Sequence, residues 1–230
     1  TKLGAIGALL NTTQRGKLLS HSLNLVKPRF FVVGEELLEA FNEVRQQVPG
    51  AERPCYWLAD RDTLQDSGPT PDGWINLGLR QARQSEQNLP DSLRVRMKDP
   101  CFYIYTSGTT GLPKASIMSH GKWIKAYGGF GHSGLGLDSR DVLYLTLPCY
   151  HNNAVTVCWG SALAGGAAIA LRRKFSASAF WKDVAHYQAT SFGYIGELCR
   201  YLLNQPVTAD ERNNSLTSMI GNGLRPAIWA

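Results

Sequence analysis

Residues 103–115 read YIYTSGTTGLPKA, and this stretch indicates what the rest of the chain is built around. An apolar run ends at Tyr105, and all six positions 106–111 that follow are Gly, Ser or Thr. Glycine lets backbone N–H groups crowd around an oxyanion, because a side chain would block the approach and restrict the backbone angles. Hydroxyls add donors, and Lys114 adds a point charge suited to phosphate. The pattern therefore predicts a loop that cradles a polyphosphate.

Two simpler interpretations fit this loop less well. An ordinary polar turn between strands needs only one or two residues of these types. The phosphate loop of nucleotide hydrolases follows the pattern G-x-x-x-x-G-K-[ST], in which the last hydroxyl binds Mg²⁺. Here Gly108 and Gly111 are followed by LPK at 112–114, and Ala115 stands where that hydroxyl should be. Because Pro113 also removes a backbone donor, the loop is a cradle of a different kind.

Strand-like and helix-like segments alternate on both sides of the loop. Short apolar runs predict strands, and apolar residues at helical spacing predict helices. The expected strands are 3–10, 30–33, 55–59, 101–105, 115–119, 141–147, 167–171, 190–195 and 218–221. The expected helices are 14–26, 35–48, one from about 121, 153–164, one capped by Ser176 and running to 188, and 197–204. This alternation predicts an α/β fold with a largely parallel sheet flanked by helices.

Three portions are expected along the chain. Residues 1–59 form a first α/β portion, and residues 100–230 form an α/β portion that contains the phosphate loop. Residues 60–99 are rich in Asp, Gln, Ser, Gly, Pro and Arg without a sustained period, which predicts a polar surface excursion. The uncharged run 154–171, followed by RRK, imitates a membrane span. Its internal glycines favour a buried helix followed by a buried strand instead.

Composition excludes several classes of protein. Of the 230 residues, 43% are hydrophobic and 18% are charged, which is typical of a globular protein rather than a disordered one. The net charge of +6 is not gathered in a basic block interleaved with aromatic residues, so nucleic acid is not an expected partner. The five cysteines are widely spaced and include no C-x-x-C pair, so no metal site or disulfide framework is expected. Such cysteine usage fits a reducing cytoplasm.

The segment YTSGTTGLPK (105–114) resembles the phosphate-binding signature of the adenylate-forming, AMP-binding superfamily, and further segments resemble one branch of it. That branch comprises the fatty-acid transport proteins and very-long-chain acyl-CoA synthetases. The similar segments are KLGAIGALLN (2–11), LPCYHNNAV (147–155), FSASAFWKDV (175–184), YIGELCRYLLNQP (194–206) and GNGLRPAIW (221–229). The resemblance implies that the chain is part of the N-terminal region of the adenylate-forming fold. It also implies that the C-terminal lid lies outside these residues.

The resemblance implies a ligase that acts in two steps. A fatty acid attacks the α-phosphate of ATP to give an acyl-adenylate and pyrophosphate, and coenzyme A then displaces AMP. The nucleotide-binding residues implied are Tyr105, Thr106, Ser107, Gly108, Thr109, Thr110, Gly111, Lys114, Gly221, Asn222 and Gly223. The catalytic residues implied are Lys114, Thr106 and His151, with Thr106 and Thr109 as the foremost hydroxyls. Mg²⁺ would neutralise the phosphates, and its glutamate ligand is expected after residue 230, so no metal ligand is expected here.

Several alternatives stay open from the sequence. His151 ends an apolar strand, where a structural histidine is as reasonable as a functional one. Glu197, in the YIGE turn that begins at Tyr194, fits either a helix N-cap or a site residue. The whole protein could instead be a nucleotide-binding fatty-acid transport protein without ligase chemistry, or could adenylate another carboxylic acid. We expect an internal fragment, inactive alone, of a protein that is cytoplasmic or peripheral to the inner face of a membrane.

Overall fold

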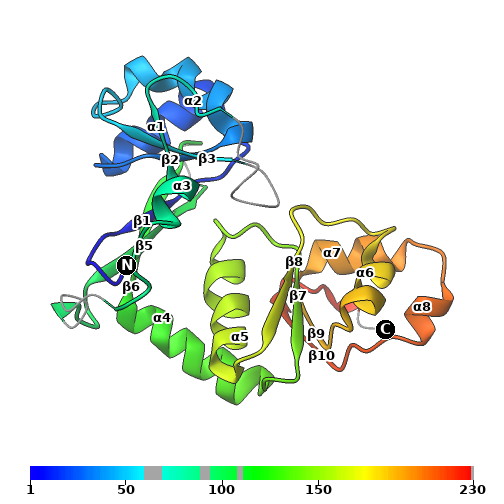
Figure 1. Cartoon of the computed structure of the whole chain (residues 1–230). Helices are drawn as coiled ribbons and strands as arrows, with labels where there is room; N and C mark the ends of the chain where they lie inside the picture. The colour runs from blue at the N-terminus through cyan, green and yellow to red at the C-terminus, as the bar shows by residue number, and fades with distance from the viewer. Residues whose placement is uncertain (60–68, 89–93, 108–110, 229–230) are drawn as a thin grey trace. The chain divides into compact units, whose positions relative to one another are not determined.

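The computed structural model describes residues 1–59, 69–88, 94–107 and 111–228 (Figure 1). These residues divide into two compact units. Unit 1 comprises Thr1–Val95 and Pro100–Ile117, and unit 2 comprises Arg96–Asp99 and Met118–Ala230. The strand that leads into the phosphate loop therefore packs with the first part of the chain rather than with the residues that follow it.

One sheet of unit 1 is parallel and has the order β2-β3-β4. Its strands are β2 (Val32–Gly34), β3 (Cys55–Leu58) and β4 (Trp74–Asn76). Helix α1 (Gly16–Val26) and helix α2 (Leu38–Val44), which is flanked by the 3-10 turns η1 (Glu35–Leu37) and η2 (Arg45–Gln47), pack against one another. Leu23, Phe41 and Trp57 bring α1, α2 and β3 into one buried apolar cluster. Burying such side chains stabilises a fold by roughly 1.5–3 kcal/mol each.

The other sheet of unit 1 carries the phosphate loop. It has the order β1-β5-β6, with β1 (Gly7–Leu9), β5 (Pro100–Thr106) and β6 (Lys114–Ser119). Strands β1 and β5 are parallel, and Gly7, Ala8 and Leu9 pair with Phe102, Tyr103 and Ile104. The loop thus leaves a central strand and returns into an edge strand of the same sheet.

The segment 60–99, expected to be a polar excursion, contains regular structure. Besides β4, the structure places the short helix α3 (Leu77–Gln81) here. Asn76 caps this helix, because its Oδ1 accepts a hydrogen bond of 3.0 Å from the backbone N–H of Leu79. Trp74 is only 9% exposed and joins the core of the unit. The expectation of an excursion is therefore wrong for residues 74–81, where a strand of three residues is too short to show a period.

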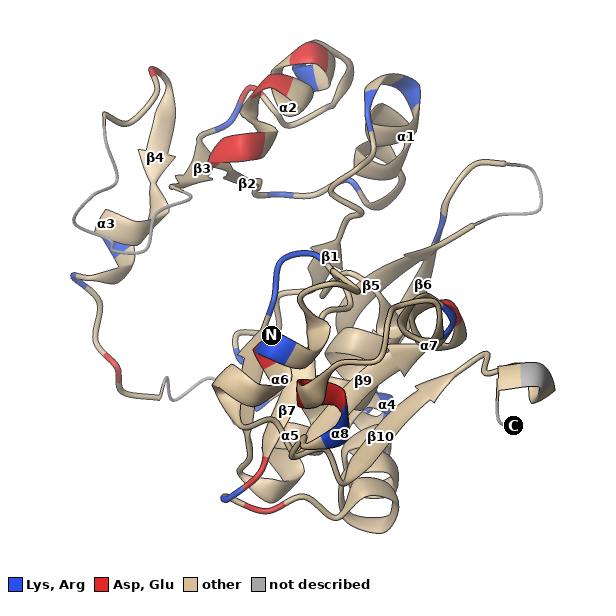
Figure 2. Cartoon of the chain, turned by 90° about the vertical axis from the view of Figure 1, so that its right-hand side faces the viewer, with Lys and Arg blue, Asp and Glu red and all other residues tan. Residues whose placement is uncertain are grey.

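Unit 2 is built on a parallel sheet with the order β10-β9-β7-β8. Its strands are β7 (Val142–Leu145), β8 (Ala168–Leu171), β9 (Ser191–Ile195) and β10 (Ser218–Asn222). None of these strands carries a charged residue, and β7, β9 and β10 are accordingly tan in Figure 2. Leu143, Tyr144 and Leu145 are fully buried, which fits a parallel sheet that is covered on both faces.

Helices cover both faces of this sheet. Helix α5 (Trp159–Gly165) lies on one side, and α6 (Phe180–Tyr187) and α7 (Gly196–Leu203) lie on the other (Figure 1). The short helix α8 (Ala209–Arg212) and the 3-10 turn η7 (Pro226–Ile228) complete the unit. With the parallel pairings of unit 1, this arrangement confirms the predicted α/β fold with largely parallel sheets flanked by helices.

Two expected helices of unit 2 differ in detail from the prediction. Helix α4 (His120–Ala126), capped by the Ser119 hydroxyl, continues as the π-helical segment η5 (Tyr127–Leu135), and the π-helical segment η6 (Asn153–Cys158) precedes α5. The predicted cap at Ser176 is wrong: α6 begins four residues later, after Ala179, and has no side-chain cap.

The run that imitates a membrane span is divided between η6, α5 and β8. Across the described part of the chain, no helix combines the length and the apolar character needed to cross a bilayer.

Candidate functional site

The two ends of the phosphate loop are open to solvent. Thr106 ends β5 and is exposed, as is Ser107, while Lys114 begins β6 and is also exposed. Gly111 has φ +81°, and a β-carbon there would meet no atom within 4 Å. The predicted contacts Gly108, Thr109 and Thr110 lie outside the described residues. The described ends therefore leave hydroxyls, an unobstructed backbone and an ammonium group free to meet an anion.

The hydroxyl of Tyr105 points into the interior of unit 1. The hydroxyl donates a buried hydrogen bond of 2.8 Å to the carbonyl oxygen of Ser22 on α1. Burial raises the pKa of Tyr105 to about 12, so the hydroxyl keeps its proton at neutral pH. This interaction occupies the hydroxyl and joins the start of the loop to α1.

The far end of the loop is joined to the same helix. The Nε2 atom of His21 lies 3.0 Å from the carbonyl oxygen of Pro113. A carbonyl oxygen only accepts, so Nε2 carries the proton in this hydrogen bond. Two consecutive residues of α1, His21 and Ser22, thus contact the two ends of the loop.

The described loop residues fit a triphosphate better than they fit a metal. Thr106 and Ser107 supply hydroxyl donors and Lys114 supplies a cation, which suits the oxygens of a phosphate chain, whereas Mg²⁺ is usually bound through carboxylates and substrate phosphates. No cluster of His, Cys, Asp and Glu able to hold a metal ion occurs among the residues that the structure describes.

In unit 2, His151 lies just beyond the carboxyl end of β7. Its backbone N–H donates a hydrogen bond of 2.9 Å to the carbonyl oxygen of Pro148, and its ring lies 4.6 Å from that of Tyr150. His151 is exposed, but neighbouring groups partly desolvate its imidazole, and this desolvation lowers the pKa of His151. The imidazole is therefore mainly neutral at pH 7.

Asn153 connects this segment to the next strand of the sheet. Its Nδ2 donates a hydrogen bond of 3.0 Å to the carbonyl oxygen of Tyr194, the penultimate residue of β9. Its Oδ1 accepts a weak hydrogen bond of 3.6 Å from the thiol of Cys158. The segment that follows His151 is thereby held at the carboxyl edge of the parallel sheet, where ligands of α/β proteins usually bind.

The glycines of the GNG turn have structural reasons of their own. A β-carbon at Gly221 would collide with the carbonyl oxygen of Tyr194, and one at Gly196 would collide with that of Gly223. Gly223 itself adopts φ +74°, which side chains disfavour. Asn222 ends β10 and is exposed. Close backbone contact between β10 and the β9–α7 turn therefore accounts for Gly221, and the positive φ accounts for Gly223. Together the two glycines leave a wall without side chains.

Glu197 is engaged in an ion pair. It lies in the first turn of α7, whose N-cap is Ile195, and its carboxylate accepts hydrogen bonds from Arg200. The hydrogen bond from Arg200 lowers the pKa of Glu197. The interpretation of Glu197 as the N-cap is wrong, because the cap position belongs to Ile195.

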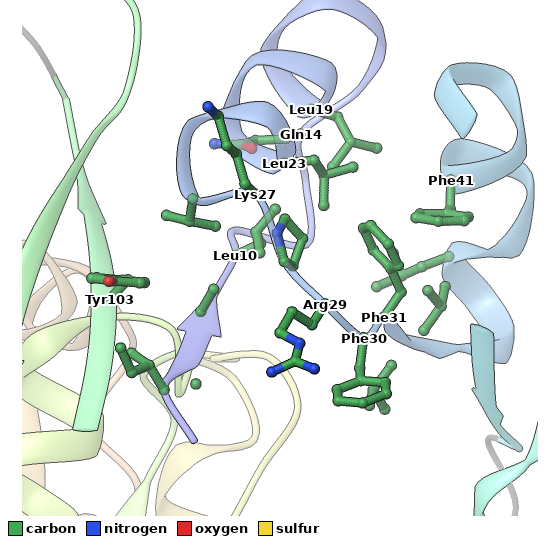
Figure 3. A pocket seen from close by; sticks show the side chains of 18 of the residues that line it. Leu10, Gln14, Leu19, Leu23, Lys27, Arg29, Phe30, Phe31, Phe41 and Tyr103 are labelled. Atoms are coloured by element: carbon green, nitrogen blue, oxygen red, sulfur yellow. The ribbon is translucent and has the colours of Figure 1, made fainter. Parts of the chain in front are cut away.

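A pocket of about 880 Å³ opens in unit 1, and the described residues that line it include none of those expected to bind nucleotide (Figure 3). Its walls are mainly apolar, with Leu23, Phe31 and Phe41 from the core of the unit and Tyr103 from β5. Lys27 and Arg29, on the segment that leaves α1, add two cations. Sequence reasoning did not predict this pocket, because it forms between segments that are distant in the chain.

The structure thus gathers the expected site residues in two places. Unit 1 holds Tyr105, Thr106, Ser107, Gly111 and Lys114 around one loop, and unit 2 holds His151, Gly221, Asn222 and Gly223 at or beside one sheet edge. Sequence reasoning missed three contributors: His21, Ser22 and Asn153. Only the position of Asn153 within LPCYHNNAV gave any signal.

Comparisons with known proteins identify the family of the chain. The model of the AMP-binding enzyme family matches residues 1–230. The chain is 41% identical over 228 residues to the medium/long-chain-fatty-acid–CoA ligase FadD6 of Mycobacterium tuberculosis, covering 99% of this chain and 36% of that protein. It is 39% identical over 228 residues to the long-chain fatty acid transport protein 1 of Rattus norvegicus, covering 99% of this chain and 34% of that one. The chain thus spans about a third of the length of these relatives.

Solved structures share the fold. The N-terminal domain of FACL13 from Mycobacterium tuberculosis aligns with a TM-score of 0.76 at 20% identity, covering 99% of this chain and 53% of that one. The anthranilate CoA ligase AuaEII, in complex with anthranoyl-AMP, aligns with a TM-score of 0.79 at 20% identity, covering 99% of this chain and 43% of that one. Because the family match extends over all 230 residues and the fold agrees, the chain belongs to the AMP-binding enzyme family.

Proposed function

We propose that this chain is the phosphate-loop part of an ATP-dependent fatty acid–CoA ligase that activates a long-chain or very-long-chain fatty acid as its adenylate. The observation that carries the proposal is the open loop between β5 and β6, with Thr106 and Ser107 exposed at one end and Lys114 at the other. The relative named a medium/long-chain-fatty-acid–CoA ligase supports the choice of substrate. Substrates are then a fatty acid, ATP and coenzyme A.

The loop residues would stabilise the negative charge of the triphosphate. Attack of a carboxylate on a phosphate brings two anions together, so the site must neutralise charge on the departing pyrophosphate. Hydroxyls of Thr106 and Ser107 would donate to phosphate oxygens, with Gly108, Thr109 and Thr110 expected to contribute between them. The ammonium group of Lys114 would stabilise the negative charge that develops on the departing pyrophosphate. Mg²⁺, when bound by the phosphates, would screen the remaining charge.

The residues of unit 2 would hold the rest of the substrates. The side-chain-free wall of Gly221 and Gly223 suits the flat face of adenine, and Asn222 offers an amide beside it. A neutral His151 beside the carboxyl end of β7 suits the neighbourhood of the reacting carboxylate, where it can donate or accept a hydrogen bond without adding charge. Coenzyme A then displaces AMP in the second step.

The test is pyrophosphate exchange by the full-length protein with acids of graded chain length and with an aromatic acid. Exchange between ATP and labelled pyrophosphate reports adenylate formation before coenzyme A is added. We expect exchange to depend on a long-chain fatty acid, and acyl-CoA to appear once coenzyme A is supplied. Exchange supported only by an aromatic or amino acid would overturn the choice of substrate, and failure to bind ATP would overturn the proposal itself.

A second candidate function is fatty-acid transport without ligase chemistry. Relatives named long-chain fatty acid transport proteins, from mouse and rat among others, favour it. Lys114→Met in the full-length protein separates the two, because ligase chemistry needs the phosphate loop. Fatty-acid uptake that persists when acyl-CoA formation stops would favour transport as an independent activity. Either function suits a cytoplasmic protein or one that is peripheral to the inner face of a membrane.

We also propose that the 230 residues alone do not complete either step. They span 36% of the relative named a ligase, and the described residues include no cluster able to hold Mg²⁺. Robust pyrophosphate exchange by the isolated 230 residues would overturn this proposal.

A further inference from the structure

Helix α1 contacts the phosphate loop at both of its ends. At the first end, the hydroxyl of Tyr105 donates to the carbonyl oxygen of Ser22 over 2.8 Å, in a buried position. At the second end, Nε2 of His21 donates to the carbonyl oxygen of Pro113 over 3.0 Å, in a partly buried position. The two contacts come from neighbouring residues of one helix, and they bracket residues 106–112.

The contact at Pro113 has a geometric consequence for Lys114. Proline has no N–H, so its carbonyl is its sole main-chain hydrogen-bonding group. The peptide bond between Pro113 and Lys114 is planar, so the direction of this carbonyl determines the direction of the Lys114 N–H on its other side. By holding the carbonyl, His21 determines where the backbone of Lys114 starts into β6, and hence where its ammonium group can reach.

The contact at Tyr105 acts on the other arm of the loop. Tyr105 is 9% exposed and immediately precedes Thr106, so its ring and hydroxyl fix the backbone from which the Thr106 and Ser107 hydroxyls project. A loop rich in glycine loses more conformational freedom on ordering than other loops do. Holding both arms in the free protein reduces the ordering that an incoming ligand must impose.

We propose that His21 and Tyr105 are positioning residues that hold the two described ends of the phosphate loop, at Thr106 and Lys114, in place for ATP before ATP arrives. The proposal rests on the proposed function, because it takes the loop to be the site of the triphosphate. Neither side chain touches the nucleotide in this proposal. Their effect is on the affinity for ATP, through the placement of Lys114 and Thr106.

The first experiment does not depend on activity. Hydrogen exchange of the full-length protein without nucleotide, followed in peptides that cover 103–115, compares His21→Leu, His21→Gln and Tyr105→Phe with the unmodified protein. Glutamine keeps an N–H donor at a similar reach, whereas leucine has none. We expect exchange of the loop to rise severalfold in His21→Leu and Tyr105→Phe, to stay near the unmodified level in His21→Gln, and to be unchanged in peptides from β7 and β9. Equal loop exchange in His21→Leu and His21→Gln would overturn the proposal.

The second experiment measures the same variants by steady-state kinetics. Loss of one hydrogen bond predicts a rise of about 3- to 10-fold in KM for ATP. We expect that rise in His21→Leu and Tyr105→Phe, with kcat and the KM for fatty acid within about twofold of the unmodified protein. His21→Gln should restore the KM, and the matched change His186→Leu, at an exposed histidine of α6, should not alter it.

The two experiments separate the two claims. If the loop loosens but the KM for ATP is unchanged, the loop is held as described but is not where ATP binds, so the positioning role fails together with the proposed function. If ATP-dependent ligase activity is present but His21→Leu changes neither exchange nor KM, the positioning role alone fails. Equal losses in kcat and in both KM values would indicate general destabilisation and would also overturn the specific role.

Discussion

Asn153 donates a hydrogen bond from Nδ2 to the carbonyl oxygen of Tyr194, and this 3.0 Å contact joins the segment after β7 to the carboxyl end of β9. The same carbonyl oxygen lies where a β-carbon on residue 221 would have to sit. This one carbonyl oxygen therefore accepts a hydrogen bond from the first residue of η6, and it also leaves no room for a side chain at position 221 of β10. The segment that follows His151 and the GNG turn of unit 2 are in this way arranged around a single peptide group.

We first predict that Asn153→Ala destabilises unit 2. The variant removes the donor to the carbonyl oxygen of Tyr194 in a partly buried position, and such losses cost about 1–3 kcal/mol. The free energy of unfolding, measured in urea by tryptophan fluorescence, should fall by that amount. The neighbouring change Asn152→Ala, at an exposed position without a side-chain cap, should stay within about 0.5 kcal/mol of the unmodified protein. Equal stabilities for the two variants would contradict the role of Asn153.

We next predict that Gly221→Ala is destabilising although it adds only a methyl group. The new β-carbon would collide with the Tyr194 carbonyl oxygen, and relieving such overpacking costs about 1–3 kcal/mol. Gly128→Ala is the matched control, because a β-carbon there meets no atom within 4 Å. In the helical setting of η5 that change should be neutral or stabilising by up to about 1 kcal/mol. Thermal unfolding of both variants checks the prediction, and the opposite order would refute it.

The third prediction concerns Lys114 in the full-length protein. A charge-assisted hydrogen bond to phosphate is worth about 1.5–3 kcal/mol, so Lys114→Met should lower kcat/KM for ATP roughly 10- to 150-fold. Lys125→Met, at an exposed residue of α4, removes the same charge elsewhere and should change kcat/KM less than about twofold. A loss shared equally by the two variants would point to overall charge rather than to the loop.

Much of the fold could be predicted from the sequence because its signals are local. The strands β7 and β9 are short runs without a charged residue, and helix α1 ends at Val26, two residues before Pro28, as the predicted end before this proline required. The strand β4 could not be predicted in the same way. Its three residues pair with β3, and a segment this short shows no alternation of apolar and polar residues that would distinguish it from a loop.

The candidate site was predictable only in part for a related reason. The six successive Gly, Ser and Thr residues at 106–111 predict an anion-binding loop, because an ordinary turn requires only one or two residues of these types. It cannot reveal that Tyr105 would direct its hydroxyl to Ser22, 83 positions earlier in the chain. Nor can it show that His21, which has no place in the motif, lies beside Pro113. Contacts at such separations depend on the packing of α1 against the sheet.

Our last prediction follows from the pKa of Tyr105, which burial raises from 10 to about 12. A raised pKa means that the folded protein retains a proton that the unfolded chain releases. The associated stability is therefore fully present below pH 10 and is lost as the pH rises toward 12, by about 1.4 kcal/mol per pH unit. Tyr105→Phe removes the hydroxyl, so the variant should be less stable than the unmodified protein by about 1 kcal/mol at pH 8. Because the variant has no hydroxyl to titrate at this position, it should lose less stability than the unmodified protein between pH 10 and pH 12. Urea unfolding at pH 8, 10 and 11 measures this difference, in which the other raised groups, such as Tyr144, are common to both proteins and cancel. Parallel pH profiles for the two proteins would show that the Tyr105 hydroxyl is not buried against α1.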